Sequence, residues 1–249
     1  MLGFLIKLIA FVAVYFAELL VPFYPGRRMI WAHDLRNVIM GAINIAAMSV
    51  LTLYITNALR ESTWGVLNWT NLPVLLEYIL AFLTLDLYIY LWHRLNHRIK
   101  FLWRFHRVHH TDLSVDASSA FRFHIVEVAL SMVGRLALIA LLGIPALLVF
   151  IFEAVFSSVV YFHHSNIGIT ERADRLLRTI IPSPHMHRVH HSVKRVETDS
   201  NYGSVLSIWD RLFGSFRLVG NPMAIVQGLE EHRDPGSQTL VGMMKTPFV

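Results

Sequence analysis

The sequence lacks cysteine altogether, so it can form neither disulfide bonds nor thiolate metal sites. Any bound metal ion must therefore be held by histidine, aspartate or glutamate. Charged residues are scarce, at 16% of the 249 residues, whereas 55% are hydrophobic and the mean hydropathy is +0.49. Soluble domains are usually about 45–50% apolar. The composition predicts an integral membrane protein, and no linker divides the sequence, so we expect residues 1–249 to form a single domain.

Five long apolar stretches predict an all-α membrane protein, because a helix needs about 20 mostly apolar residues to cross a bilayer. The first has no basic residue at its start and no small-residue cleavage site at its end, which favours an uncleaved anchor over a signal peptide. The last two meet at Gly143-Ile144-Pro145, which predicts a tight helical hairpin that either crosses the bilayer fully or is partly re-entrant. We therefore expect four to five transmembrane helices and a histidine-rich helical cap. The stretches are Leu2–Val21, Val38–Ala58, Leu72–Trp92, Ile125–Leu142 and Ile144–Phe162.

Basic residues are spread unevenly among the connections, and this sets the expected orientation. Lys and Arg number three in residues 22–37, six in 93–124 and ten in 163–249, but only one in 59–71. If the N-terminus is outside, the basic connections all face the cytoplasm, and the histidine-rich cap faces it with them. The net charge of +5 forms no basic arm or face, so we expect no nucleic-acid partner. Arg135 and Glu153 lie nine residues either side of Ile144, and equal helical rise predicts that they pair.

Histidine is strongly clustered, because twelve of the fourteen histidines fall between His93 and His191. His93 and His97 have an i, i+4 spacing, which places both rings on one face of a helix. The pentapeptide His-Arg-Val-His-His then occurs twice, at 106–110 and at 187–191, and one helical turn would point its three imidazoles at one spot. A metal-binding turn used twice predicts two metal ions, or two walls of one dinuclear site.

The identity of the metal cannot be read from imidazole ligands alone, since zinc, copper, iron and nickel all accept them. Eight to ten converging histidines nevertheless exceed the needs of a single ion. A metal transporter or store would place its ligands near the bilayer midplane, whereas these lie at the ends of the apolar stretches. Those two functions and a membrane zinc hydrolase stay as alternatives, although the common His-Glu-x-x-His motif is absent. Histidines outside the clusters are interpreted as ordinary interfacial side chains: His33, His185 and His232.

Six short motifs occur in a fixed order: HRLNH, HRVHH, HHSN, a second HRVHH, NYG and IWDRLFG. Over roughly Asp86–Phe216 this combination resembles the fatty acid hydroxylase and sterol desaturase superfamily of membrane di-iron oxygenases. It is similar to the alkylglycerol monooxygenase branch and to bacterial sterol desaturase-like proteins. The resemblance implies an oxidoreductase with two iron ions, which uses O2 to abstract hydrogen from a lipid C–H bond and so hydroxylates or desaturates it.

The resemblance also implies a set of metal ligands and of acidic residues behind them. In several family members a further ligand lies one helical turn before His164, but here position 160 is Val, and either His124 or His163 could take its place. The acids are expected to accept hydrogen bonds from ligating imidazoles, or else to be interfacial charges or helix caps. They are Asp86, Asp112, Asp116, Glu127 and Asp199. The predicted ligands are His93, His97, His106, His109, His110, His124, His164, His187, His190 and His191.

The expected partners are a lipid that enters from the bilayer and a separate electron donor of the ferredoxin or cytochrome type. A separate donor is expected because nothing in the sequence resembles a fused cytochrome or flavin domain, and no GxGxxG motif is present. The segment Asn201–Gly214 is expected to support the site. Within it, Trp209, Leu212 and Phe213 would either pack beneath the histidine turns or lie among the lipid headgroups.

Overall fold

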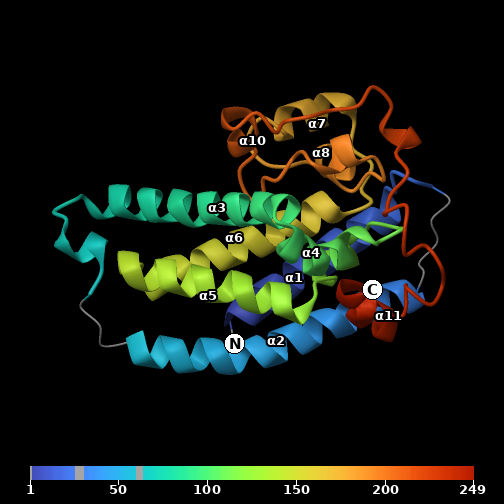
Figure 1. The fold of residues 1–249 in the computed structure, drawn as a ribbon. Coiled ribbons are helices and arrows are strands. Elements are labelled where there is room, and N and C mark those ends of the chain that lie inside the picture. Colours follow the sequence, from blue (N-terminus) through green and yellow to red (C-terminus); the bar gives the residue numbers. More distant parts are fainter. Residues whose placement is uncertain (1, 26–30, 60–63) are drawn as a thin grey trace.

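The protein is a bundle of long helices that carries a cap of short ones (Figure 1). The computed structural model describes residues 2–25, 31–59 and 64–249, and for residues 50–59 it describes the backbone alone. Within these ranges no strand forms beyond two isolated bridges. The long helices are α1 (Leu2–Leu20), α2 (Trp31–Leu59), α3 (Val74–Arg98), α5 (Ile125–Leu142) and α6 (Ala146–His164).

Four of the five apolar stretches are confirmed as helices long and apolar enough to cross a membrane. Among the described residues these are α1, α3, α5 and α6. The remaining stretch, Val38–Ala58, lies within α2, and its second half falls outside the residues whose side chains are described. The multi-pass, all-helical prediction is therefore confirmed for the described part of the chain.

The predicted hairpin is formed by α5 and α6. Gly143 ends α5 with φ of 69°, a left-handed conformation that glycine adopts without a Cβ clash. Pro145 precedes the first turn of α6, where its fixed φ suits the start of a helix. The predicted contact between Arg135 and Glu153 is confirmed as an ion pair. Lys7 of α1 joins it, with Nζ 2.9 Å from Oε2 of Glu153.

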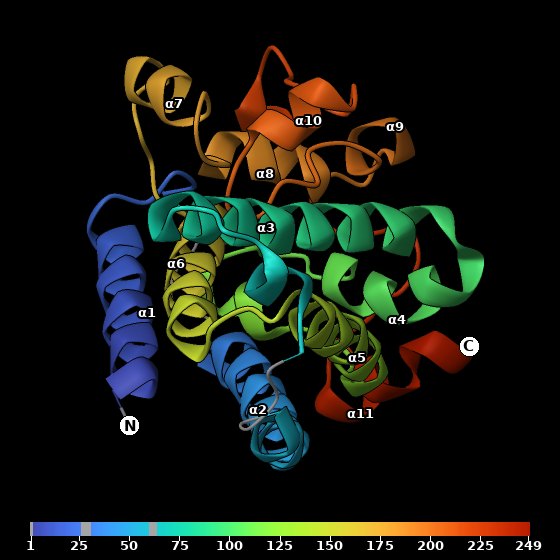
Figure 2. The same cartoon turned by 90° about the vertical axis from the view of Figure 1, so that its left-hand side faces the viewer.

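Most of the short elements gather at one end of the bundle, whereas η1 (Val66–Trp69) lies at the other end, beside the turn between α5 and α6 (Figure 1). Both views place α7, α8 and α10 together above α3, with α2 on the opposite side (Figure 1 and Figure 2). An apolar core between α3 and α6 includes Leu85, Ile89, Leu148 and Phe152, and Val205 of the cap packs against it. The cap therefore lies directly on the helices that carry histidines. Its elements are α4 (Lys100–His110), η2 (Ala117–Phe121), α7 (Glu171–Leu177), α8 (Pro184–His190), α9 (Arg195–Thr198) and α10 (Ile208–Leu212).

Candidate metal centre

The clustered histidines come from four helices whose ends meet. His93 and His97 lie in the last two turns of α3, and the chain then bends at Ile99, where the backbone is extended, straight into α4. His164 is the last residue of α6. The second pentapeptide forms α8, which is capped by the Ser183 side chain and begins with a proline. Local capping and helix breaks thus bring distant histidines to one level.

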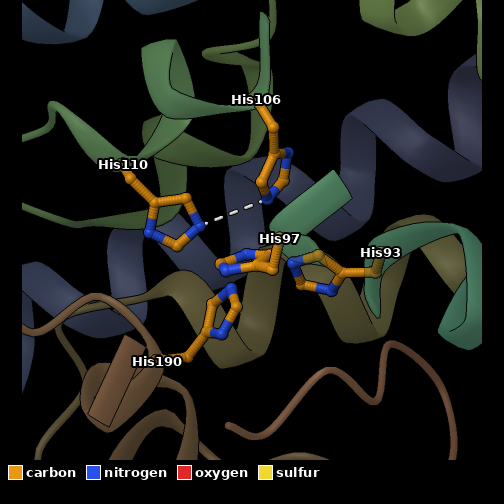
Figure 3. Close-up of side chains that lie close together, drawn as sticks. All are labelled: His93, His97, His106, His110 and His190. Atoms are coloured by element: carbon orange, nitrogen blue, oxygen red, sulfur yellow. Dashed lines mark hydrogen bonds between the residues drawn. The ribbon is translucent and has the colours of Figure 1, made fainter. Parts of the chain in front are cut away.

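The imidazoles form two adjoining groups in which every ligand atom lies within 4.8 Å of the others. Nε2 of His106 and Nε2 of His110 are 3.2 Å apart in the first group, which Figure 3 shows converging. In the second group, Nε2 of His164 is 3.1 Å from that of His109 and 3.0 Å from that of His187. The five-histidine group is His93, His97, His106, His110 and His190; the four-histidine group is His109, His164, His187 and His191.

Each repeated pentapeptide contributes to both groups. The first gives its i, i+4 pair, His106 and His110, to the five-histidine group and His109 to the other. The second gives His187 and His191 to the four-histidine group, while His190 joins the first. The rings of His110 and His191, one from each group, are 4.8 Å apart. This exchange makes one site of two parts rather than two separate sites.

In the five-histidine group the nitrogens that point inward have few protein partners, whereas most of the outward ones are held by hydrogen bonds. Nδ1 of His93 lies 2.9 Å from the Tyr202 carbonyl, and Nδ1 of His190 lies 2.7 Å from that of Ser200. The Nε2 atoms of His93, His97 and His190 are buried without a hydrogen-bond partner. Buried polar atoms are nearly always satisfied, and metal-ligating histidines usually donate their other N–H in this way. The residues therefore fit a metal centre.

Burial keeps the imidazoles of the cap in the form that binds metal. It lowers the pKa of these histidines well below the usual value, and the neighbouring imidazoles lower it further. Neutral imidazole is the form that ligates a metal ion. The residues concerned are His109, His110, His187, His190 and His191.

Two of the five predicted acidic residues contact the histidines directly. Oε1 of Glu127 lies 2.6 Å from Nδ1 of His106, and Oδ1 of Asp199 lies 3.2 Å from Nδ1 of His97. Asp86 instead accepts hydrogen bonds from the backbone N–H groups of Val205 and Leu206 and from the indole of Trp209. Asp86 therefore anchors residues 205–209 rather than a ligating imidazole.

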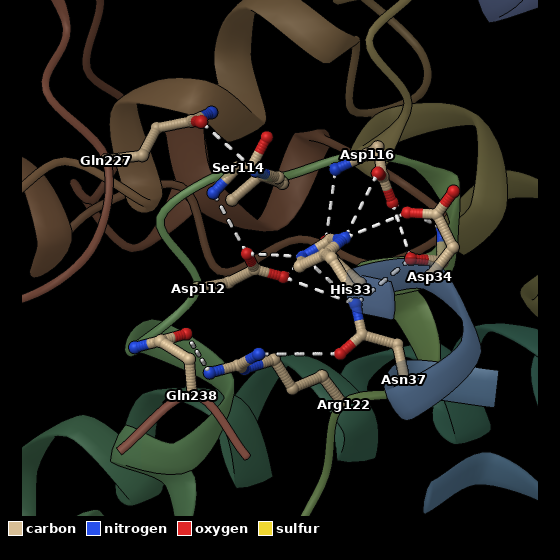
Figure 4. A network of polar contacts seen from close by, with 12 residues as sticks. His33, Asp34, Asn37, Asp112, Ser114, Asp116, Arg122, Gln227 and Gln238 are labelled. Carbon is tan, nitrogen blue, oxygen red and sulfur yellow. Dashed lines mark hydrogen bonds and ion pairs between the residues drawn. The ribbon is translucent and has the colours of Figure 1, made fainter. Parts of the chain in front are cut away.

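The other two acids, Asp112 and Asp116, lie in a separate polar network centred on His33 (Figure 4). Nε2 of His33 is 2.8 Å from Asp112, and its Nδ1 is 2.9 Å from Asp34. Asp116 caps η2. His33 is thus a buried ion-pairing residue, which corrects its interpretation as an ordinary interfacial side chain. The network joins the start of α2 to the loop that follows the histidines of α4.

The remaining histidines lie outside both groups. His124 caps α5, its Nδ1 accepting from the Val126 N–H, and its ring packs on Phe105 and Phe248. His163 is fully buried beside the four-histidine group, with its ring 4.1 Å from that of His187 and its Nδ1 without a partner. His185 lies 3.5 Å from Asp174, and His232 belongs to neither histidine group. The structure thus gathers nine of the ten predicted ligands and leaves His124 apart.

The sequence alone did not single out several supporting groups. Asp210 accepts hydrogen bonds from the N–H groups of Tyr202 and Gly203, which fixes the carbonyl that His93 contacts. The Val160 carbonyl lies 2.8 Å from Nδ1 of His164, so the residue at this position serves through its backbone. A carbonyl partner has no side-chain signature. Of the apolar residues expected to support the site, Phe213 stacks on Tyr90, whereas Leu212 is 65% exposed.

A cavity of about 320 Å³ connects the centre with the interior of the bundle. At one end it is lined by histidines of both groups, among them His93 and His109. Its walls are mainly apolar and come from α2, α3, α5, α6 and η2, and its far end reaches Lys7 and Arg135. Ligand cavities in proteins measure about 300–1,000 Å³. Its size and lining suit the hydrocarbon chain of a lipid.

The sequence matches one protein family model and is similar to several lipid hydroxylases and monooxygenases. The fatty acid hydroxylase family model matches residues 78–215. The ornithine lipid hydroxylase OlsE of Rhizobium tropici is 30% identical over 63% of this chain and 46% of its own length. Human alkylglycerol monooxygenase is 32% identical over 55% of this chain and 29% of its length, and rat cholesterol 25-hydroxylase is 24% identical over 71% and 62%. The matches thus span less than half of the first two relatives. No solved structure matches.

Proposed function

Because the chain belongs to the fatty acid hydroxylase family, we propose that it is a membrane-embedded di-iron oxygenase that hydroxylates a C–H bond of a lipid. The observation that carries the proposal is the pair of adjoining histidine groups at the end of a largely apolar cavity. A site made of two adjoining histidine groups agrees with the prediction, from the repeated pentapeptide, of two metal ions. We propose hydroxylation rather than desaturation because the matched relatives are named as hydroxylases and monooxygenases.

The proposed ligands are the nine gathered histidines, with His163 as the tenth in place of His124. The buried ring of His163 lies 4.1 Å from that of His187, and its Nδ1 has no hydrogen-bond partner. The ring of His124 instead packs on Phe105 and Phe248, outside both groups. With His163 each metal ion would have five imidazoles. Bound iron would supply the oxygen chemistry that protein side chains cannot.

The protein's own groups would then orient and protect the reaction. Glu127 and Asp199 contact the outer nitrogens of His106 and His97, which fixes the direction of both rings. The cavity presents a lipid chain to the centre while it keeps water away. Hydroxylation consumes two electrons, and we propose that a separate ferredoxin or cytochrome on the cytoplasmic side delivers them.

The test is to measure metal identity and stoichiometry in protein purified without oxygen, together with His109→Ala and His190→Ala, one variant in each group. We expect about two irons per chain, a loss of metal in both variants, and oxidised lipid when reductant and O2 are added. Lys245→Ala, at an exposed position on α11 (Leu240–Lys245), should retain its iron. One zinc per chain would favour a hydrolase instead and overturn the proposal.

A further inference from the structure

The end of the cavity away from the histidines carries two cations that share one carboxylate. Nζ of Lys7 lies 2.9 Å from Oε2 of Glu153, and Arg135 pairs with Oε1 of the same residue. Among the described residues, neither cation has another ion pair. Lys7 and Arg135 line the cavity, but Glu153 does not. This end of the cavity therefore has a net charge of +1.

The position of these groups along the bundle separates them clearly from the metal centre. Glu153 is eleven residues before His164 in α6, which at 1.5 Å per residue is about 16 Å. One ionisable side chain within an apolar helix is costly, and it is usually paired or functional. Arg135 and Glu153 would already form a neutral pair by themselves. With Lys7 added, two positive charges face one carboxylate, and one positive charge is left without a counter-ion in this group.

The charges that line the cavity differ at its two ends. Among the described lining residues the single carboxylate is Glu127, which lies at the histidine end and contacts His106. An anion would be repelled there and attracted by Lys7 and Arg135 at the other end. In a medium of low dielectric constant, both effects are much stronger than in water. The electrostatic potential in the cavity therefore favours an anion at the end with Lys7 and Arg135 and disfavours it at the histidine end.

We propose that the cavity binds an amphiphile with one anionic group, a carboxylate or a phosphate, held by Lys7 and Arg135. Its hydrocarbon chain runs towards the histidines, so oxidation falls on the chain far from the anionic group. This inference rests on the proposed lipid oxygenase function and names its substrate class. The anion neutralises the surplus charge, and the apolar walls between the two ends pack against the chain.

The first test is competitive binding, read by native mass spectrometry in a neutral detergent and without reductant, so that no turnover occurs. The probes are a saturated fatty acid, the alkyl phosphate and the fatty alcohol of the same chain length. We expect at least one of the two anions to exceed the alcohol by about tenfold, equivalent to about 1.4 kcal/mol. A preference confined to the acid or to the phosphate identifies the anionic group. Equal binding of all three probes overturns the proposal.

Two variants and a control locate the preference. Lys7→Met leaves the neutral pair of Arg135 and Glu153 intact, so it should fold and bind acid and alcohol equally. Lys7→Arg should retain the preference, as should Lys245→Met at an exposed site outside the cavity. A preference that survives in Lys7→Met would place the anion elsewhere and contradict the proposal.

A second measurement tests the direction of the chain on the native protein and needs no variant. A photoreactive group at the tail of a fatty acid should label the cavity near Trp92 and Phe123, at the histidine end. The same group beside the carboxylate should label α1 and α5 near Lys7 and Arg135. Reversed labelling overturns the inference. Because binding does not require iron, intact binding with no iron would refute the oxygenase function alone, whereas lipid oxidation without anion preference would refute this inference alone.

Discussion

The Nδ1 atom of His106 lies 2.6 Å from Oε1 of Glu127, and the same oxygen accepts a hydrogen bond from Asn96 at 3.2 Å. The contact links the start of α5 to a histidine of α4 and an asparagine of α3. It leaves Nε2 of His106 directed at the other rings of its group, 3.2 Å from Nε2 of His110. The carboxylate therefore determines which nitrogen of His106 is available to a metal ion.

Removing this carboxylate should weaken metal binding without removing a ligand. We expect Glu127→Ala to reduce iron affinity by about 10–100-fold, the usual effect of losing such an outer hydrogen bond. Glu127→Gln should lose less, because its amide oxygen can still accept from Nδ1. Titration against a competing chelator measures both, with Glu230→Ala at an exposed position as the control. An unchanged affinity in Glu127→Ala would show that the contact has no part in metal binding.

The crossed contribution of the two pentapeptides predicts which histidine variants behave alike. His109→Ala should resemble His187→Ala, and His110→Ala should resemble His190→Ala, although 109 and 110 are neighbours in sequence. Within a group the double variant should lose little more metal than either single one, because sites that act as a unit are not additive. Between groups the losses should add. Iron content per chain measures both, and pairing by pentapeptide instead of by group would contradict the structure.

Periodicity and spacing predicted most of the fold and the convergence of the histidines. Apolar stretches gave the helices, and Gly143 and Pro145 gave the hairpin, because both signals are local. The exchange of His109 and His190 between groups depends on how α4 and α8 face each other, which no local spacing encodes. The same holds for Asp86, which was expected to accept a hydrogen bond from a ligating imidazole. Its partners lie in residues 205–209 of the cap.

Backbone partners account for the rest of what sequence reasoning missed. The carbonyls of Val160, Tyr202 and Ser200 hold imidazoles, yet any residue type could supply them. The ion pairs of His33 were missed for a different reason. Its acidic partners Asp112 and Asp116 are about 80 residues away in the sequence. Only the packing of α2 against η2 brings them together.

Variants of His163 and His124 should show which of the two is the tenth metal ligand. We expect His163→Ala to lower iron content, because its ring is 4.1 Å from that of His187 within the buried centre. His124→Ala should cost stability through loss of a helix cap, about 1 kcal/mol, while iron content stays near the native value. Metal analysis combined with thermal unfolding separates the two effects. Iron lost in His124→Ala but kept in His163→Ala would reverse the assignment.

The network around His33 should make stability depend on pH in the alkaline range. Burial by itself would lower the pKa of His33, but the carboxylates of Asp112, Asp34 and Asp116 outweigh it and raise this pKa to about 10. A group with a raised pKa stabilises the fold fully below its unfolded pKa of 6.5 and loses that contribution as pH rises through 10. Burial also raises the pKa of Asp116 to about 8, and its ionisation lowers stability over part of the same range.

We therefore expect the apparent Tm of the native protein to fall between pH 6.5 and 10, with a steeper fall than in His33→Gln. The glutamine can hydrogen-bond to Asp112 but carries no charge to lose, so the difference between the two curves isolates His33. A difference on the order of 1 kcal/mol corresponds to a few degrees for a chain of this length. Arg172→Gln, at an exposed position on α7 outside the network, should follow the native curve. Parallel curves for the native protein and His33→Gln would mean that His33 is neutral in the folded state, and the network would then be held by neutral hydrogen bonds.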